Sequence, residues 1–459
     1  MKTNLILDTD SYKSSHFLQY PPGTNYMTSY VESRGGEYPG TIFFGLQYIL
    51  KSVLSQKVTE EMVMEANEFF KNHGLPFPLD GWLYIAKERE GKLPIKIRAV
   101  NEGSYIPGKN VLMTVESTDS KVYWIVGWLE TMLLRIWYPI TVSTQSFYIK
   151  KLIYKYLEET ADDPDSEILF KLHDFGSRGV SSREQAMIGG AAHLVNFLGS
   201  DTVIGIDMAN RYYNILMAGF SIPAAEHSTI TAWGKENEKL AYENMLSYFA
   251  KKDSLVAVVS DSYDIYNACE KIWGEELKQK VIDSGATVVI RPDSGVPWEI
   301  VPEVAEILAN KFGTSTNSKG YRVFNNVRII QGDGVDPESI EKILKKLKEK
   351  GFSASNIAFG MGGALLQKVN RDTLKFAFKC SGIEVDGVFR GVSKSPITDP
   401  GKNSKEGKLE LVERNGEILT VPREKVEKTD KLLLKDVFEN GKILVEDSFE
   451  EIRKRAKIK

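Results

Sequence analysis

The sequence predicts an α/β fold that combines a parallel sheet with a second, mixed and partly antiparallel β domain. From about residue 165 to residue 363, short apolar runs alternate with amphipathic helical stretches, and after residue 380 two Asn-Gly pairs signal hairpins. A chain of 459 residues has room for two or three domains. We expect residues 1–150 and 385–459 to share one discontinuous mixed α+β domain, and residues 151–384 to form the α/β domain.

The composition is that of an ordinary globular protein, with 42% hydrophobic and 26% charged residues and a formal net charge of -3. This balance argues against a nucleic-acid or membrane-surface partner held by bulk electrostatics. The two cysteines, Cys269 and Cys380, are too few for a disulfide framework. No apolar run has the length of a signal peptide or a membrane span, so we expect a cytoplasmic protein without nucleic-acid or membrane partners.

Near the N-terminus, Thr9–Lys13 follows a short apolar run and is expected to be a loop or the start of a helix. Ile95–Ala99 and Val111–Val115 are predicted to be partner strands. The segment Tyr123–Trp137 is apolar on nearly every side, which predicts a buried helix that Pro139 ends.

The central region repeats a unit of one short apolar run followed by a helical stretch. Repeated units of this kind predict parallel strands with right-handed crossovers, either in a barrel or in an open doubly wound sheet. Ser181 and Glu184 have the spacing of a capping box at the start of one of these helices. The expected strands are Ile168–Leu172, Thr202–Ile206 with Asp201 at its start, Leu255–Val259, Thr287–Ile290, Val327–Ile330 and Ile357–Phe359.

Two antiparallel hairpins are predicted near the C-terminus. Leu409–Val412 and Ile418–Val421 flank Asn415-Gly416, while Leu432–Phe438 and Ile443-Leu444 flank Asn440-Gly441. Asn-Gly between apolar runs is the strongest short-range hairpin signal, because both residues tolerate positive φ. These hairpins supply the antiparallel part of the predicted discontinuous domain.

Polar residues close each expected parallel strand, and the carboxyl ends of such strands lie along one edge where ligands bind. Asp, Ser and Gly are ordinary turn residues, but arginine is not, and Arg178 and Arg291 both lie at strand ends. Two guanidinium groups, several carboxylates and two Gly-rich turns on one edge describe a pocket for a substrate with sugar hydroxyls and more than one phosphate.

His227 lies at the centre of Ser221–Trp233, which is predicted to be a loop that runs into a helix. Pro223 resists regular structure before it, and Ser228 or Thr229 is a candidate helix cap. An imidazole near neutral pKa can pass on a proton or accept a phosphoryl group. By itself, a single histidine is more often structural.

Several long motifs, in this order, resemble those of the nicotinamide phosphoribosyltransferase family: His173–Ser182, Ala224–Thr229, Ser260–Tyr266, Arg291–Gly295 and Gln331–Val335. The resemblance extends from Thr9–Lys13 to Ser448–Arg453, which is essentially the whole chain. It implies a dimeric type II phosphoribosyltransferase with an irregular α/β barrel that acts in NAD salvage. The implied reaction joins nicotinamide to 5-phosphoribosyl 1-pyrophosphate, with Mg²⁺, and gives nicotinamide mononucleotide and pyrophosphate. The resemblance does not identify the residues that bind Mg²⁺.

The leaving pyrophosphate is negatively charged, so Arg178, Arg291 and Arg371 are candidates to stabilise it together with Mg²⁺. Lys379 is a weaker candidate for the same role across a dimer. By resemblance, Asp293 binds the ribose hydroxyls. The remaining assignments place the 5′-phosphate on the backbone of Gly332, Asp333, Gly362 and Gly363, and nicotinamide between Phe175 and Tyr12, with Tyr12 supplied by the second subunit of a homodimer.

Asp201 supports nicotinamide over nicotinic acid, because a carboxylate accepts a hydrogen bond from a carboxamide NH₂ and repels a second carboxylate. By resemblance, His227 is phosphorylated by ATP, which stimulates product formation, and Asp261 is a candidate to orient its ring. Two alternatives are nicotinate phosphoribosyltransferase, which Asp201 argues against, and a sugar-phosphate-binding barrel without turnover. The arginines and His227 disfavour the second alternative.

Overall fold

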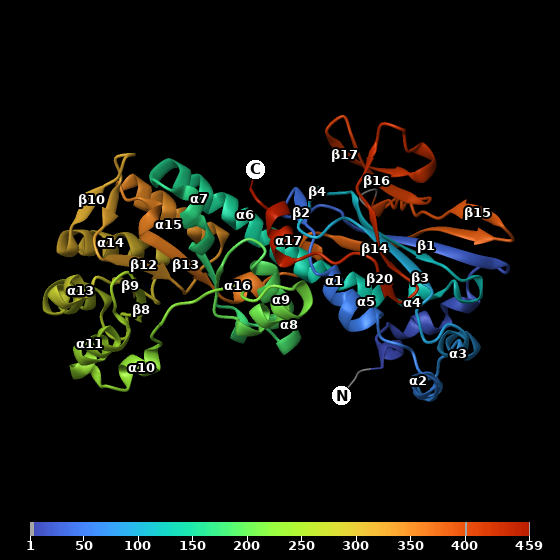
Figure 1. Cartoon of the computed structure of the whole chain (residues 1–459), viewed down its shortest axis with the longest axis horizontal. Coiled ribbons are helices and arrows are strands. Elements are labelled where there is room, and N and C mark those ends of the chain that lie inside the picture. Colours follow the sequence, from blue (N-terminus) through green and yellow to red (C-terminus); the bar gives the residue numbers. More distant parts are fainter. Residues whose placement is uncertain (1–3, 400–401, 459) are drawn as a thin grey trace. The chain divides into compact units, whose positions relative to one another are not determined.

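The computed structural model describes residues 4–399 and 402–458, and these residues form two compact units (Figure 1). Unit 1 comprises residues 4–144, 211–215 and the described part of 370–457, and unit 2 comprises residues 145–210, 216–369 and 458. The ends of the expected domain ranges, 1–3 and 459, lie outside the described residues. The expected boundaries at 150 and 385 stay a prediction.

Unit 1 is built around a seven-stranded antiparallel sheet of order β15-β14-β1-β5-β3-β19-β20. Strands from the C-terminal part of the chain lie on both sides of the N-terminal strands β1, β5 and β3, so both ends of the chain build one mixed β domain. Its strands are β1 (Thr24–Ser33), β3 (Ile95–Ala99), β5 (Val111–Ser117), β14 (Phe376–Val385), β15 (Val388–Gly391), β19 (Lys435–Glu439) and β20 (Lys442–Ile443). The predicted pairing of Ile95–Ala99 with Val111–Val115 is confirmed.

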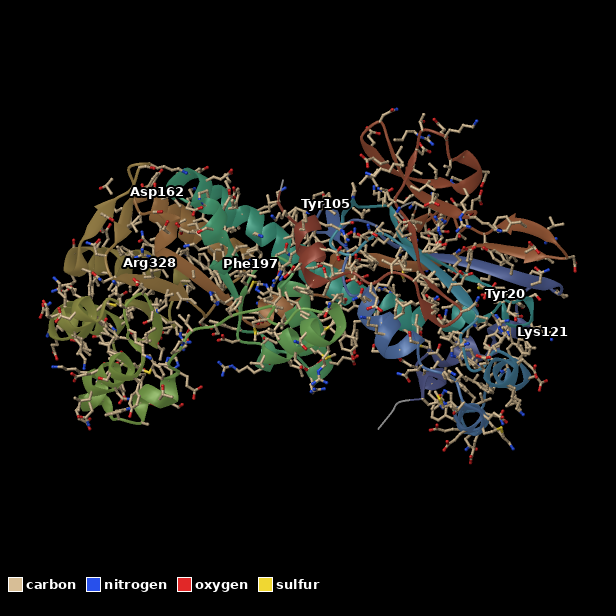
Figure 2. The ribbon with its side chains drawn as sticks, viewed as in Figure 1. Tyr20, Tyr105, Lys121, Asp162, Phe197 and Arg328 are labelled. Atoms are coloured by element: carbon tan, nitrogen blue, oxygen red, sulfur yellow. The ribbon has the colours of Figure 1, made fainter. Side chains whose placement is uncertain are left out.

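Smaller sheets and helices complete unit 1. A three-stranded sheet has the order β17-β16-β18, and β2 pairs with β4, which contains Tyr105 (Figure 2). The Tyr105 ring fills the space beside Gly40. The strands are β2 (Gly40–Ile42), β4 (Tyr105–Pro107), β16 (Leu409–Arg414), β17 (Glu417–Pro422) and β18 (Lys431–Leu432). The helices include α1 (Leu46–Ile49), α2 (Glu60–Asn72), α3 (Leu79–Glu88), α4 (Ile125–Trp128), α5 (Glu130–Leu134) and α17 (Phe449–Arg455).

Both predicted hairpins form, with one change. Arg414 pairs with Glu417 and Glu439 pairs with Lys442, so each loop is the two-residue Asn-Gly turn, with positive φ at Asn415 and Asn440. The expected single strand Leu432–Phe438 is instead two, β18 and β19, which pair with β16 and β3 respectively.

The expected helix Tyr123–Trp137 was wrong in its extent. The chain forms α4 and α5 and then begins the long helix α6 (Trp137–Thr160), which contains Pro139 in its first turn. A proline there sacrifices no intrahelical hydrogen bond, because the first N–H groups of a helix have no partner within it. Pro139 therefore stands at a helix start.

Unit 2 contains a six-stranded parallel sheet of order β7-β6-β13-β12-β9-β8, which confirms the parallel α/β fold. Its strands are β6 (Leu172–Asp174), β7 (Gly199–Ser200), β8 (Leu255–Val259), β9 (Thr287–Arg291), β12 (Val327–Gln331) and β13 (Ile357–Met361). Val288 and Ile290 are buried on one face and Val289 on the other, as expected for parallel strands covered on both sides.

Helices follow most of these strands (Figure 1), and a β10–β11 hairpin, Thr314–Thr316 with Arg322–Phe324, follows α14. The helices are α7 (Pro164–Glu167), α8 (Arg183–His193), α9 (Val203–Tyr213), α10 (His227–Thr231), α11 (Glu238–Phe249), α12 (Ile265–Asn267), α13 (Lys278–Ser284), α14 (Pro297–Phe312), α15 (Pro337–Glu349) and α16 (Gly363–Leu366). The predicted apolar face of α15, with Ile340, Ile343, Leu344 and Leu347, is buried.

Three local predictions in unit 2 were wrong. Thr202–Ile206 is not a strand, because Val203 begins α9, and the strand at this position is the short β7 before Asp201. Ile168–Phe170 is a 3₁₀ turn, and its strand begins at Leu172. The capping residue of α8 is Ser182, whose hydroxyl accepts from the Gln185 N–H at 3.1 Å, one position after the expected Ser181.

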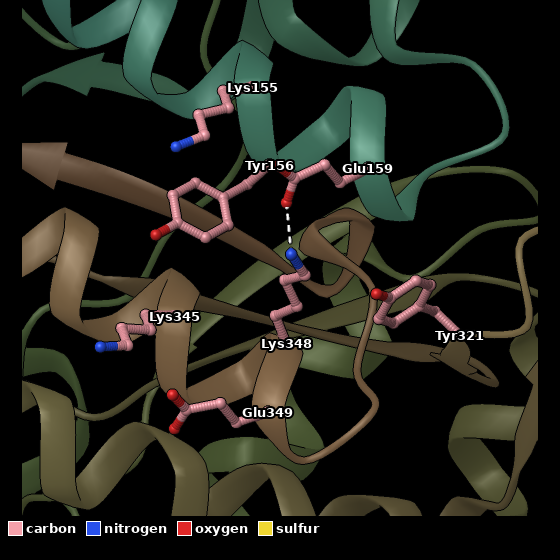
Figure 3. A pocket seen from close by; sticks show the side chains of 7 residues that line it. All are labelled: Lys155, Tyr156, Glu159, Tyr321, Lys345, Lys348 and Glu349. Carbon is pink, nitrogen blue, oxygen red and sulfur yellow. Dashed lines mark hydrogen bonds and ion pairs between the residues drawn. The ribbon is translucent and has the colours of Figure 1, made fainter.

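The carboxyl end of α6 packs against α15 through polar side chains. Lys348 of α15 lies 2.6 Å from Glu159 of α6, in a shallow pocket that Tyr156 and Tyr321 also line (Figure 3). Beyond α6, the Asp162 carboxylate accepts hydrogen bonds from the backbone N–H and the hydroxyl of Ser318. These contacts fix the outer layer of unit 2.

Candidate active site

An extended segment, residues 220–225, connects the two edges of the parallel sheet in unit 2. The Phe220 N–H donates to Leu198 O and the Ser200 N–H donates to Phe220 O, beside β7. At the other edge, the Ala225 N–H donates to Ala257 O of β8 at 2.9 Å. The sheet is thereby curled, and the chain leaves its edge directly before His227.

His227 and Asp261 form the first pair of the candidate site. His227 is the first residue of α10, and its Nε2 lies 2.9 Å from Oδ1 of Asp261, two residues after β8. The helix cap is Glu226 rather than the expected Ser228 or Thr229, although the Thr229 hydroxyl accepts from the Glu226 N–H at 3.3 Å. The His227 side chain is 47% exposed and the Asp261 side chain only 4%. The buried carboxylate therefore orients a ring that solvent and ligands can reach.

Arg291 and Asp293 form the second pair, at the end of β9. The guanidinium Nη2 lies 3.5 Å from Oδ2 of Asp293. Burial raises the pKa of the Asp293 carboxyl, and the negative charges of Asp261 and Asp333 add to this rise, whereas Arg291 and His227 oppose it. The predicted carboxylates and the arginine therefore share one electrostatic environment.

The Gly-rich turn after β12 joins this group. A Cβ on Gly332 would lie 3.0 Å from Oδ1 of Asp293, 3.5 Å from Cε2 of Phe175 and 3.6 Å from Cδ of Arg291. The backbone of Gly332 therefore lies close to three predicted site residues. Gly332 thus lies at the centre of the cluster.

Phe175 projects from the turn after β6 onto the inner face of the sheet. Its ring packs against a buried cluster of Ala257, Val289 and Ile330, one residue each from β8, β9 and β12. Its backbone N–H donates to Met361 O at 3.0 Å. The ring is therefore a fixed aromatic surface at the carboxyl edge of the sheet.

The second Gly-rich turn, Gly362-Gly363, lies against the same loop. A Cβ on Gly362 would be 3.7 Å from Phe175 O, and one on Gly179 would be 3.2 Å from the Gly363 Cα. Gly363 has open space around it and begins α16. Its backbone is accessible to a ligand group.

Asp201 and Arg178 line a pocket of about 670 Å³ beside α8. The Asp201 N–H donates to Asp174 O at 2.9 Å, and Oδ1 accepts from the Ser221 hydroxyl at 2.5 Å. The residue is thus fixed at both backbone and side chain. It follows strand β7 instead of starting a strand, so it lies at the carboxyl edge with the other predicted residues.

Three predicted residues belong to unit 1. Tyr12 is 56% exposed in a 3₁₀ helix, Ser11–Leu18, and Arg371 lies 3.6 Å from Asp372. Lys379 lies on β14, where burial lowers the pKa of its ammonium group. The predicted residues that the structure brings together all belong to unit 2.

Three features of the site were not predicted from the sequence. Asp174 is fully buried, accepts from the Gly176 N–H at 2.7 Å, and has a pKa that burial raises to about 6. Arg291 Nε and Ser262 Oγ are buried without a hydrogen-bond partner among the described residues. Gly360, in β13, lies under the Phe175 ring. A glycine inside a strand pattern was the one available sequence signal, because it often marks a close approach.

No group of three or more His, Cys, Asp or Glu side chains is arranged to hold a metal ion within residues 4–399 and 402–458. Over the same ranges, no helix combines the length and the apolar character that a membrane span requires.

Two solved structures share this fold. Nicotinate-nucleotide pyrophosphorylase from Pyrococcus furiosus has a TM-score of 0.62 at 16% identity, covering 99% of this chain and 95% of that one. Human nicotinic acid phosphoribosyltransferase has a TM-score of 0.57 at 16% identity, covering 98% and 92%. The chain therefore belongs to the fold class of these two proteins.

Sequence comparisons narrow this class. Residues 170–442 match the nicotinate phosphoribosyltransferase (NAPRTase) family, and residues 4–97 match the nicotinamide phosphoribosyltransferase N-terminal domain. A nicotinamide phosphoribosyltransferase of Xanthomonas campestris is 52% identical, covering 99% of this chain and 98% of that protein. One of Acinetobacter baylyi is 31% identical, covering 99% and 97%. The chain belongs to the nicotinamide phosphoribosyltransferase family.

Proposed function

We propose that this protein transfers the 5-phosphoribosyl group from 5-phosphoribosyl 1-pyrophosphate to nicotinamide, giving nicotinamide mononucleotide and pyrophosphate in NAD salvage. The full-length relationship at 52% identity to a nicotinamide phosphoribosyltransferase is the observation that carries this proposal. The arrangement of charged and aromatic residues at the carboxyl edge of the unit 2 sheet supports it and suggests a role for each residue.

Displacement of pyrophosphate places negative charge on the leaving group and positive charge on the ribose. Arg291 suits the first role, since its guanidinium lies at the carboxyl end of β9 beside Asp293. Arg178 in the adjoining pocket is a second donor, and we assign Arg371 and Lys379 to the same anion. Asp293 is the acceptor for the ribose hydroxyls, and the backbone at Gly332, Asp333, Gly362 and Gly363 receives the 5′-phosphate.

Magnesium fits this site only as an ion shared with the substrate. The carboxylates of Asp261, Asp293 and Asp333 influence one another electrostatically, yet the described residues hold no three-ligand cluster of their own. Mg²⁺ is commonly held by one or two carboxylates together with substrate phosphates. These three residues are the candidates, and the bound ion would offset the charge of the pyrophosphate.

The Phe175 ring provides one face of the base site, and we assign the other face to Tyr12 of a second subunit in a homodimer. The 56% exposure of Tyr12 is consistent with a residue that contacts a partner. Asp201, held by Ser221, accepts a hydrogen bond from the nicotinamide NH₂.

We further propose that ATP phosphorylates His227 and stimulates turnover. A ring nitrogen attacks the γ-phosphorus, the bond to the bridging oxygen breaks, and ADP leaves. Because Nε2 faces the Asp261 carboxylate, Nε2 carries the proton and Nδ1 keeps the lone pair for this attack. We assign the protein to the cytoplasm, in agreement with the free thiols of Cys269 and Cys380.

One observation favours a second candidate, nicotinate phosphoribosyltransferase: residues 170–442 match the family of that name. The test is turnover of the purified protein with 5-phosphoribosyl 1-pyrophosphate, Mg²⁺ and equal nicotinamide and nicotinic acid, with and without ATP. We expect mainly nicotinamide mononucleotide, increased by ATP. Mainly nicotinate mononucleotide would favour the second candidate, and no product would favour a binding-only barrel.

A further inference from the structure

The ring of Phe175 lies directly against the backbone of Gly360. A Cβ at position 360 would lie 2.0 Å from Cε2, 2.2 Å from Cδ2 and 2.7 Å from Cζ of Phe175. Carbon atoms in ordinary contact are about 3.5 to 4.0 Å apart. No side chain at position 360 is therefore compatible with the observed place of the ring.

The backbone of Gly360 does not itself require glycine. Gly360 lies inside strand β13, where it pairs with His173, and it is not among the glycines with positive φ. Alanine is compatible with this extended conformation. The ring of Phe175 is thus the feature of the fold that demands a glycine here.

The ring has little freedom to move sideways. Ala257, Val289 and Ile330 support it from β8, β9 and β12, and Ile222 and Ala358 pack against the same cluster. The backbone on either side is also held. The Phe175 N–H donates to Met361 O at 3.0 Å, and the Gly176 N–H donates to Asp174 Oδ1 at 2.7 Å. A methyl group at position 360 would push the ring away from the sheet, toward the space above it.

We propose that Gly360 is a positioning residue that sets the depth of the Phe175 ring and thereby the width of the slot that receives the planar base. This inference rests on the proposed function, in which nicotinamide stacks on Phe175. To restore normal contact with a new methyl group the ring must move by roughly 1.5 Å. Nicotinamide can stack on Phe175 only if the slot leaves room for its planar ring, and such a shift of Phe175 would remove this room.

The test compares Gly360→Ala with the wild-type protein in steady-state kinetics. We expect the KM for nicotinamide to rise at least about tenfold, since a displacement near 1 Å can cost about 100-fold. The KM for 5-phosphoribosyl 1-pyrophosphate should change less than about twofold, because its phosphates bind other residues. Equal changes in both constants, or no change in the nicotinamide KM, would overturn the inference.

A double variant separates positioning from general damage. Alanine lacks every ring atom that the new methyl group would meet, so Gly360→Ala should cost little in a Phe175→Ala background, and the double variant should be more stable than the single Gly360→Ala variant. Gly274→Ala, in the helix Ala268–Glu276 of the same unit, is the matched control, because its methyl group would be similarly crowded, 2.6 Å from Cγ of Lys311 and 2.7 Å from the Cys269 carbonyl oxygen. It should leave both KM values unchanged. Full additivity of the two changes would refute the proposal.

A crystal structure of Gly360→Ala gives a readout that does not depend on turnover. We expect the Phe175 ring to be displaced from the Ala257, Val289 and Ile330 cluster, and an unmoved ring would overturn the inference. An inactive wild-type protein would instead contradict the proposed function, whether or not the ring moves. The two failures are therefore distinguishable.

Discussion

Nε2 of His227 lies 2.9 Å from Oδ1 of Asp261, although the two residues are 34 positions apart in the chain. The contact exists because segment 220–225 pairs with β8, which brings the start of α10 beside the residue that follows the same strand. A nearly covered carboxylate thus holds a half-exposed imidazole. This geometry fixes the orientation and the tautomer of the ring.

Replacing Asp261 with asparagine should impair phosphorylation of His227. Asparagine can still accept a hydrogen bond from Nε2, but it lacks the charge that stabilises a positively charged ring. We expect about tenfold less phosphohistidine from ATP, measured by intact-protein mass spectrometry under alkaline conditions, with His227→Ala as the unlabelled control. Wild-type labelling of the Asp261→Asn variant would show that the carboxylate charge has no part in this step.

Replacing Asp201 with asparagine should relax the choice between bases. The amide keeps a hydrogen-bonding group near Ser221 but no longer repels the carboxylate of nicotinic acid. We expect the ratio of nicotinamide to nicotinate kcat/KM to fall about tenfold, which corresponds to ~1.4 kcal/mol of discrimination. Competition between the two bases in one reaction, read by liquid chromatography, measures this ratio directly. An unchanged ratio would mean that Asp201 only shapes the turn after β7.

Strong local signals predicted much of the fold. The strands at 255–259, 287–290, 327–330 and 357–359 are short, mainly apolar runs, and both Asn-Gly turns require positive φ, so these elements were predicted close to their observed limits. Thr202–Ile206 was predicted as a strand because it is a short apolar run in the repeated unit, yet helix α9 begins at Val203. A short apolar run has no periodicity long enough to separate the two outcomes.

The site was less accessible to local reasoning, because it depends on which strand ends meet. The sequence identified Arg291 and Asp293 as candidates, but not that Gly332 touches both of them and Phe175. The burial of the Asp174 carboxyl and the contact of Gly360 with the Phe175 ring depend entirely on packing between strands that are distant in the chain. Turn residues look alike in a sequence whether or not they surround a ligand.

A shared active site predicts complementation between two defective subunits. Tyr12→Ala and Arg291→Ala homodimers should each lose most activity, since one removes the partner's stacking ring and the other removes the pyrophosphate donor. In a mixed dimer, one of the two sites receives both intact residues. Random pairing at equal amounts should therefore restore about a quarter of wild-type activity.

Co-expression of the two variants with different affinity tags, followed by purification of the hybrid and a turnover assay, tests this expectation, and the purified hybrid should show about half of wild-type activity. Mixing Tyr12→Ala with untagged Tyr12→Ala serves as the control and should recover nothing. Absence of recovery in a purified hybrid would place Tyr12 outside a site shared between subunits.

Unit 1 contains a buried acid that should couple its stability to pH. Glu102 is 4% exposed, and its carboxylate accepts hydrogen bonds from the Gln47 and Gly45 N–H groups at 2.6 and 3.1 Å, at the start of α1. Burial raises the pKa of this carboxyl from 4.5 to about 7, and the negative charge of Asp447 adds to the rise. The folded protein therefore holds this proton more tightly than the unfolded chain does.

Because the folded state binds more protons than the unfolded state between pH 4.5 and about 7, stability must fall as the pH rises through this window. The loss from this one group amounts to about 3 kcal/mol. Glu102→Gln keeps one acceptor oxygen and so can satisfy only one of the two N–H groups, which lowers stability by an amount that does not depend on pH. Because the amide cannot ionise, the variant should still lose this part of the pH dependence. Denaturant unfolding of both proteins at several pH values gives the difference between their free energies of unfolding. The contributions of the other ionisable groups cancel in this difference. If the stability of the glutamine variant relative to the wild type does not increase as the pH rises, then Glu102 ionises in the folded protein without a loss of stability.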